Sequence, residues 1–132
     1  MLILNVDDDS DDREFFSDAI KVVDPKMPCL LFKDGDALLD FLESTEISPD
    51  YIFIDINMPR MNGYECAREI KENYTSGTTQ IVMFSTTFNA VDLEAFERQG
   101  FRHIIKQNSL TSLVNSIKSV ISLPVLQPVG RR

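Results

Sequence analysis

Short apolar runs alternate along this chain with longer segments in which apolar residues return every three or four positions. The short runs predict buried β-strands, and the longer period predicts amphipathic helices. The predicted strands cover residues 2–6, 29–32, 51–54, 81–84 and 104–105, and the predicted helices cover residues 10–23, 37–42, 64–74, 90–99 and 110–121. Regular alternation of strands with helices indicates a parallel sheet that has helices on both faces.

General rules of chain connection narrow the order of these strands. Right-handed crossovers exclude most arrangements, and the doubly wound order 2-1-3-4-5 is the natural candidate for five strands. The run Tyr51-Ile52-Phe53-Ile54 is apolar on both faces, which suits a central strand. We therefore expect an α/β fold with a doubly wound five-stranded parallel sheet and five helices.

Polar residues mark the ends of the predicted helices. Asp11 is predicted to cap the first helix, with Glu14 reaching back three residues later. Ser109 is predicted to cap the last helix, and Gly100 is predicted to end the fourth. These signals follow one another without a linker or an internal repeat.

The length and charge of the chain limit its class. Its 132 residues fit one domain, and we expect a domain over residues 1–123, a short C-terminal tail over residues 124–132 and no output domain. The formal net charge is −8. This charge argues against a nucleic-acid partner, because phosphate backbones need a basic surface.

Cysteine usage and hydropathy indicate the compartment. Cys29 and Cys66 form no CxxC pair and no zinc spacing, so we expect reduced thiols. The sequence starts without a basic and then apolar leader, and no apolar run approaches the roughly 20 residues that span a bilayer. We expect a cytoplasmic protein with no membrane insertion.

Three carboxylates follow apolar strands. Asp7 and Asp8 come directly after the first predicted strand, and Asp55 comes after the third. Ligands of open α/β sheets bind beyond the carboxyl ends of the strands. Three anions there repel one another and need a cation or a raised pKa, and an all-oxygen ligand set suits Mg²⁺. The sequence predicts a Mg²⁺ site beside an aspartate that can take a phosphoryl group.

The other strand ends add a hydroxyl and an ammonium. Ser85 and Thr86 follow the fourth predicted strand, and Lys106 follows the fifth. Phosphoryl transfer to a carboxylate needs a nucleophile and groups that balance the charge on the phosphoryl oxygens. The three carboxylates and Lys106 leave a charge of −2, which one Mg²⁺ ion cancels.

Four motifs in chain order carry a resemblance to a known family. They are Val6-Asp7-Asp8-Asp9, Asp55-Ile56-Asn57-Met58-Pro59-Arg60-Met61-Asn62-Gly63, Ser85-Thr86 and Lys106. Over roughly residues 2–121, the chain resembles the receiver domain of bacterial two-component response regulators. The resemblance implies a flavodoxin-like receiver fold of the stand-alone, chemotaxis-regulator-like type.

The resemblance also implies a role for each strand-end residue. Asp55 is the expected phosphoacceptor. Asp7, Asp8, Asp55 and the backbone carbonyl of Asn57 are the expected Mg²⁺ ligands, with Asp8 the more direct of the acidic pair. Ser85 and Lys106 are expected to contact phosphoryl oxygens.

A second set of positions is expected to modulate the reaction. The side chains of Asn57 and Thr87 fall where the family modulates hydrolysis of the aspartyl phosphate, and Thr86 would narrow access to the pocket. His103 replaces a Tyr or Phe that moves inward with the strand-four hydroxyl. Two interpretations of His103 stay open: a polar surface residue without a switch role, or a smaller, pH-sensitive switch.

Gln107 follows Lys106 at a position where the family usually has proline, often after a cis bond. A cis bond before a non-proline residue costs about 2.5–4 kcal/mol. We therefore expect a trans bond, or a strained one held by its surroundings.

The resemblance implies a phosphorylation-dependent signalling switch of a two-component phosphorelay. A histidine kinase or a histidine phosphotransfer protein would supply the phosphoryl group to Asp55. A downstream protein would read the change on the face formed by helix 90–99, strand 104–105 and helix 110–121. Such a receiver is not an enzyme in the usual sense, because it catalyses only its own phosphorylation and dephosphorylation.

Two other classes were compared with this interpretation. A small-molecule phosphatase with an aspartate nucleophile needs an Asp-x-Asp pair and a cap insertion, whereas Asp7 and Asp8 are adjacent and no insertion is present. A phosphorylation-independent receiver-like adaptor stays open, supported by Gln107 and His103. Phosphate incorporation distinguishes this adaptor from a switch.

Overall fold

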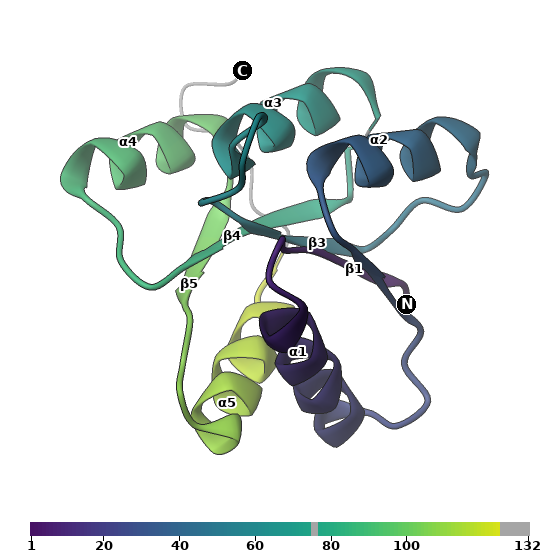
Figure 1. Ribbon diagram of the computed structural model, residues 1–132, viewed down its shortest axis with the longest axis vertical. Coiled ribbons are helices and arrows are strands. Elements are labelled where there is room, and N and C mark those ends of the chain that lie inside the picture. Colours follow the sequence, from purple (N-terminus) through teal and green to yellow (C-terminus); the bar gives the residue numbers. More distant parts are fainter. Residues whose placement is uncertain (75–76, 125–132) are drawn as a thin grey trace.

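The computed structural model describes residues 1–74 and 77–124, which form five parallel strands and five helices (Figure 1). The strands are β1 (Ile3–Val6), β2 (Cys29–Phe32), β3 (Tyr51–Asp55), β4 (Gln80–Ser85) and β5 (Arg102–Ile105). The helices are α1 (Ser10–Val23), α2 (Gly35–Ser44), α3 (Gly63–Asn73), α4 (Ala90–Gln99) and α5 (Leu110–Ile121). The sheet order β2-β1-β3-β4-β5 confirms the predicted fold class. Beyond Pro124, the predicted tail lies outside the described residues.

The two faces of the sheet are covered by different helices. In Figure 1, α2, α3 and α4 lie on one face, and α1 and α5 lie on the other. Successive side chains of a strand point to opposite faces. Leu4 therefore packs in the cluster under α2–α4, while its neighbour Ile3 packs with Phe16 of α1 and Ile117 of α5.

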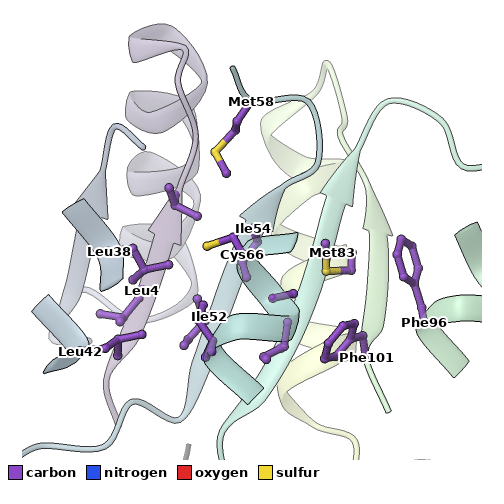
Figure 2. Close-up of a cluster of buried hydrophobic side chains, with 14 residues drawn as sticks. Leu4, Leu38, Leu42, Ile52, Ile54, Met58, Cys66, Met83, Phe96 and Phe101 are labelled. Carbon is purple, nitrogen blue, oxygen red and sulfur yellow. The ribbon is translucent and has the colours of Figure 1, made fainter. Parts of the chain in front are cut away.

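The cluster under α2–α4 extends to the loop that follows β3 (Figure 2). Leu38 and Leu42 come from α2, and Phe96 comes from α4. Met58, which is 7% exposed, belongs to the same cluster although it lies in the β3–α3 loop. The core thus anchors the loop immediately after Asp55.

Aromatic rings dominate the opposite cluster. The ring of Phe16 lies 5.0 Å from that of Phe53 and 6.0 Å from that of Phe84, measured between centroids. These tilted and edge-on contacts add to the burial of apolar area. They fix α1, and the turn before it, against the two central strands.

The helix caps correct one prediction. The predicted cap Asp11 is wrong: Asp9 is the N-cap of α1, and its carboxylate accepts the N–H groups of Asp11 and Asp12. The run of acidic residues offered several candidates, and β1 ends early enough for the helix to begin at Ser10. Ser109 caps α5 as predicted, and the αL residue Gly100 ends α4 as predicted.

Some boundaries also differ from the prediction. Asp34 caps α2, so this helix begins at Gly35 and ends at Ser44, beyond the predicted range of 37–42. Strand β5 begins at Arg102 rather than at Ile104, because parallel pairing with β4 starts opposite Val82. Pairing and capping are set by neighbours in space, which apolar periodicity does not reveal.

The cysteines and the helix lengths bear on two further expectations. Cys29 is partly exposed, Cys66 is buried, and both are free thiols. None of the helices within residues 1–74 and 77–124 is long and apolar enough to cross a membrane.

Gly63 lies where α3 begins against the end of β3. A Cβ atom at this position would lie 2.2 Å from the carbonyl oxygen of Asp55 and 2.6 Å from the Cα of Ile56. Both neighbours are backbone atoms, so no side-chain rotation relieves the contact. The Gly63 N–H donates to the Ile56 carbonyl at 2.8 Å. Glycine here lets α3 approach the strand that carries Asp55.

We expect Gly63→Ala to lower the free energy of unfolding by about 1–3 kcal/mol, the usual cost of overpacking. Urea denaturation measures this change. Gly35→Ala is the matched control, because a Cβ there would meet the flexible side chain of Met61 at 3.1 Å rather than backbone. Equal losses in the two variants would contradict the steric explanation.

Candidate functional site

Asp7, Asp8 and Asp55 meet at the carboxyl end of the sheet. Strands β1 and β3 pair in parallel with Val6 opposite Ile54, so Asp7 and Asp55 are the next residues on neighbouring strands. Each of the three carboxylates offers an oxygen within 4.8 Å of the other two. Asp7 and Asp55 are buried, whereas Asp8 is exposed. The cluster therefore has a buried base and an open rim.

Lys106 reaches this cluster from the end of β5. Its backbone N–H donates to the Ser85 carbonyl at 2.8 Å. Its Nζ lies 2.9 Å from Asp7 Oδ2 and 3.2 Å from Asp55 Oδ1, and its side chain is 16% exposed. The bond to Gln107 is trans, because no cis peptide bond occurs among the described residues. Proline is not needed to bring this ammonium to the two buried carboxylates.

Sequence reasoning missed a further partner of Lys106. Asp12 Oδ2 lies 2.9 Å from Lys106 Nζ, and Asp12 is not among the site residues predicted from the sequence. Once Asp9 is recognised as the cap, Asp12 falls in the first turn of α1, close to the end of β1. The same turn also holds Asp11, so no local signal in the sequence singles out Asp12 as the partner of Lys106.

Ser85 and Asn57 lie beside Asp55. Ser85, the last residue of β4, is 2% exposed. The Asn57 side-chain amide donates to Ser85 Oγ at 3.4 Å, and the Asn57 backbone N–H donates to Asp55 Oδ1 at the same distance. Both bonds are long, so Asn57 itself holds neither the Ser85 hydroxyl nor the Asp55 carboxylate tightly.

The remaining predicted positions surround this centre. Thr86 and Thr87 are exposed in the segment after β4. The exposed His103 ring packs on Phe88 at 5.2 Å and on Phe96 at 6.3 Å between centroids. Partial burial removes water from the imidazole and lowers the pKa of His103. Its contacts are aromatic, so the ring acts here as part of the α4–β5 packing.

Burial raises the pKa values of the two inner carboxyl groups, and a nearby negative charge adds to each: Asp12 for Asp7, and Asp7 for Asp55. Loss of water raises the pKa of Asp55 to about 6, the Asp7 charge adds to this effect, and Lys106 opposes it. Burial is also the main reason for the raised pKa of Asp7. For Lys106, burial acts to lower the pKa, but the nearby carboxylates of Asp7, Asp12 and Asp55 outweigh burial and raise it.

The donor set fits a small hard cation. Asp7 Oδ2 is buried and accepts no hydrogen bond among the described residues; its 2.9 Å contact with Lys106 is an ion pair without hydrogen-bond geometry. An unpaired lone pair on a buried carboxylate, next to two more carboxylates, suits Mg²⁺. The exposed Asp8 leaves room for the water molecules that Mg²⁺ retains.

The raised pKa of Asp55 predicts how stability depends on pH. The group binds its proton more tightly in the folded chain, with a pKa of about 6, than at the ordinary aspartate pKa of 3.8. Raising the pH through this window therefore favours the unfolded chain. In Mg²⁺-free buffer at pH 7.5, we expect Asp55→Asn to raise the free energy of unfolding by about 1–3 kcal/mol.

The difference should shrink towards pH 4, because the folded Asp55 carboxyl is then protonated and most of the cost of ionising it is gone. Urea denaturation of both proteins across pH 4–8 measures it. Asp18→Asn removes the same charge from an exposed position of α1 and should have little effect. A gain from Asp55→Asn that does not vary with pH would contradict the explanation.

Comparisons with known proteins agree with this geometry. The family model described as response regulator receiver domain matches residues 3–118. The sensory transduction protein LytT of Oceanobacillus iheyensis is 30% identical over 97 residues, which cover 71% of this chain and 38% of LytT. Response regulator Rcp1 of Synechocystis is 25% identical over 127 residues, which cover 92% of this chain and 86% of Rcp1.

Solved structures share the fold. The phosphorylated cyanobacterial phytochrome response regulator RcpA has a TM-score of 0.80 and 24% identity, over 95% of this chain and 96% of that one. The Mn²⁺-bound form of Rcp1 has a TM-score of 0.75 and 24% identity, over 92% of both chains. With the family model spanning nearly all of its sequence, this chain belongs to the response regulator receiver domain family.

Proposed function

We propose that this receiver is a phosphorylation-dependent switch in which Asp55 takes a phosphoryl group from a phosphohistidine. The observation that carries the proposal is the position of the Asp55 carboxylate, between two further carboxylates and the Lys106 ammonium. A histidine kinase or a histidine phosphotransfer protein is the proposed donor. A cytoplasmic location suits such a donor.

The proposed step exchanges one phosphorus bond for another. An Asp55 oxygen attacks phosphorus, an O–P bond forms, the N–P bond to the donor imidazole breaks, and the imidazole leaves with its electron pair. With a pKa of about 6, Asp55 is mostly ionised at neutral pH and can act as the nucleophile. Lys106 and Ser85 are placed to contact phosphoryl oxygens as charge shifts onto the leaving group.

Asp7, Asp8, Asp55 and the backbone carbonyl of Asn57 are the proposed Mg²⁺ ligands. The bound ion neutralises charge on the phosphoryl oxygens. Asp7 Oδ2, which is buried and accepts no hydrogen bond among the described residues, supports this ligand set, as does the similarity to Rcp1, which has been solved with Mn²⁺. Thr86, Thr87 and the Asn57 side chain are proposed to modulate how long the phosphoryl group persists.

The proposed output runs through α4. Asn57 contacts Ser85 and, together with Val91 and Phe96 of α4, lines a groove of about 580 Å³. New bonds from Ser85 to a phosphoryl group would compete with the Asn57 contact and shift this region. Exposed apolar side chains on α4, β5 and α5 would meet the downstream protein: Val91, Ile105 and Leu110. His103 lies within this face and is a candidate switch residue.

Phosphorylation by acetyl phosphate tests the proposal. We expect one phosphoryl group per chain, detected by intact mass, with Mg²⁺ present and none after chelation. Asp55→Ala should abolish the modification, and the exposed-site control Asp18→Ala should retain it. Folded wild-type protein that takes up no phosphoryl group would support the phosphorylation-independent adaptor instead.

Mg²⁺ binding has a separate consequence for stability. A ligand that binds only the folded state raises stability by RT ln(1 + [L]/Kd), which is about 2.7 kcal/mol at 100 times Kd. Thermal unfolding of the wild type should therefore shift upward with added Mg²⁺. Asp8→Asn should lose this shift while costing little stability without metal, because Asp8 is exposed. A retained shift would exclude Asp8 as a ligand.

A further inference from the structure

Lys106 makes its best-aligned contact outside the acidic cluster. Three carboxylates of the described residues lie within 4.0 Å of its Nζ, those of Asp7, Asp12 and Asp55. Only the 2.9 Å contact with Asp12 also has hydrogen-bond geometry. Because an ammonium directs its three N–H donors separately, the Lys106 head group is aligned toward α1 rather than toward Asp55.

The first turn of α1 is built to hold Asp12 in this position. The Asp9 carboxylate accepts the backbone N–H groups of Asp11 and Asp12, at 2.8 Å and 3.2 Å. Arg13 Nη1 donates to the Asp7 carbonyl at 2.7 Å, which ties the same turn to the end of β1. Asp12 is therefore placed by backbone and side-chain bonds on both sides of it.

We propose that Asp12 is a positioning residue that holds the Lys106 ammonium in the unphosphorylated chain and competes for it with a phosphoryl group on Asp55. This inference rests on the proposed phosphorylation of Asp55. A phosphoryl group adds oxygens next to Lys106, and the ammonium must turn from Asp12 to meet them. Asp12 also adds one negative charge near the oxygens that arrive.

The same contact has a second consequence, which does not require phosphorylation. With Asp12 engaged, Lys106 makes its hydrogen bond to Asp12, while Asp7 and Asp55, which are proposed metal ligands, have ion-pair contacts with it that lack this geometry. Removal of the Asp12 charge would free Lys106 to pair more closely with those two carboxylates and would take one negative charge from the rim. Both effects weaken Mg²⁺ binding.

Three variants separate this role from general electrostatics. Asp12→Asn removes the charge, and Asp12→Glu keeps it. Asp11→Asn removes the same charge from the same helical turn, where Asp11 and Asp12 are the two acidic residues, without touching the Lys106 contact. Losses caused by the helix dipole are thus shared by Asp12→Asn and Asp11→Asn and cancel in the comparison.

The first measurement is the rate of phosphorylation by acetyl phosphate at saturating Mg²⁺. Asp12 is 43% exposed, so its contact is partly screened by water. We expect Asp12→Asn to react about two- to fivefold faster than wild type. Asp12→Glu should stay near the wild-type rate, and Asp11→Asn should change it less than Asp12→Asn. Equal rates in the two Asn variants, or a slower Asp12→Asn, would overturn the proposal.

The second measurement is the dissociation constant of Mg²⁺ alone, from an NMR titration without phosphodonor. We expect about a two- to fivefold weakening in Asp12→Asn and a smaller change in Asp11→Asn. If wild-type protein takes up no phosphoryl group, the proposed function fails. This titration then still tests whether Asp12 positions the Lys106 ammonium, because it needs no phosphoryl group. Equal Mg²⁺ affinities in Asp12→Asn and Asp11→Asn would refute this positioning role of Asp12.

Discussion

Repulsion between the Asp7 and Asp55 carboxylates is the constraint on which the rest of the site depends. Both groups are buried at neighbouring strand ends, and burial raises the pKa of each. In the described part of the chain, the Lys106 ammonium is the cation within ion-pair distance of both. One positive charge does not balance two buried carboxylates and the nearby Asp8, so the site gains stability from a proton or a divalent cation. Because of this imbalance, the ionised Asp55 carboxylate lowers the stability of the fold and is also able to react as a nucleophile.

The fold accepts that cost because its core holds the strand ends in place. Alternating residues of β1 and β3 pack into two separate clusters on opposite faces, so a shift of either strand by one residue would move each side chain into the other cluster. Met58 anchors the loop after Asp55 to one of these clusters, and Gly63 lets α3 begin within contact of the Asp55 backbone. Core packing thus fixes the backbone next to Asp55, where the carboxylates repel one another.

The sequence predicted the parts of this arrangement that follow from chain order and periodicity. Five strands in the order 2-1-3-4-5 place Asp7, Asp8, Asp55 and Lys106 at one edge, because the carboxyl ends of parallel strands meet there. The sequence did not predict Asp9 as the cap of α1 or Asp12 as a partner of Lys106. In a run of acidic residues, each one satisfies the local rules for a cap, and only the distance to a side chain 94 positions away distinguishes Asp12. Contacts of that kind depend on the packed positions of α1 and β5.

Lys106 combines a position that chain order predicts with contacts that depend on packing, because its ammonium is shared among groups from different elements. Asp7 comes from the end of β1, Asp55 from β3 and Asp12 from α1, and each is within 3.2 Å of the same nitrogen. Under the proposed function, a phosphoryl group becomes a fourth acidic group that can bind the Lys106 ammonium, and it carries more negative charge than any of the three carboxylates. An ammonium has three donors for these four acidic groups, so at least one of the groups is left without a hydrogen bond from Lys106. The exposed Asp12 is less costly to release than the buried carboxylates, because water can replace Lys106 at its oxygens. The order of release therefore follows from burial, with α1 losing its contact first.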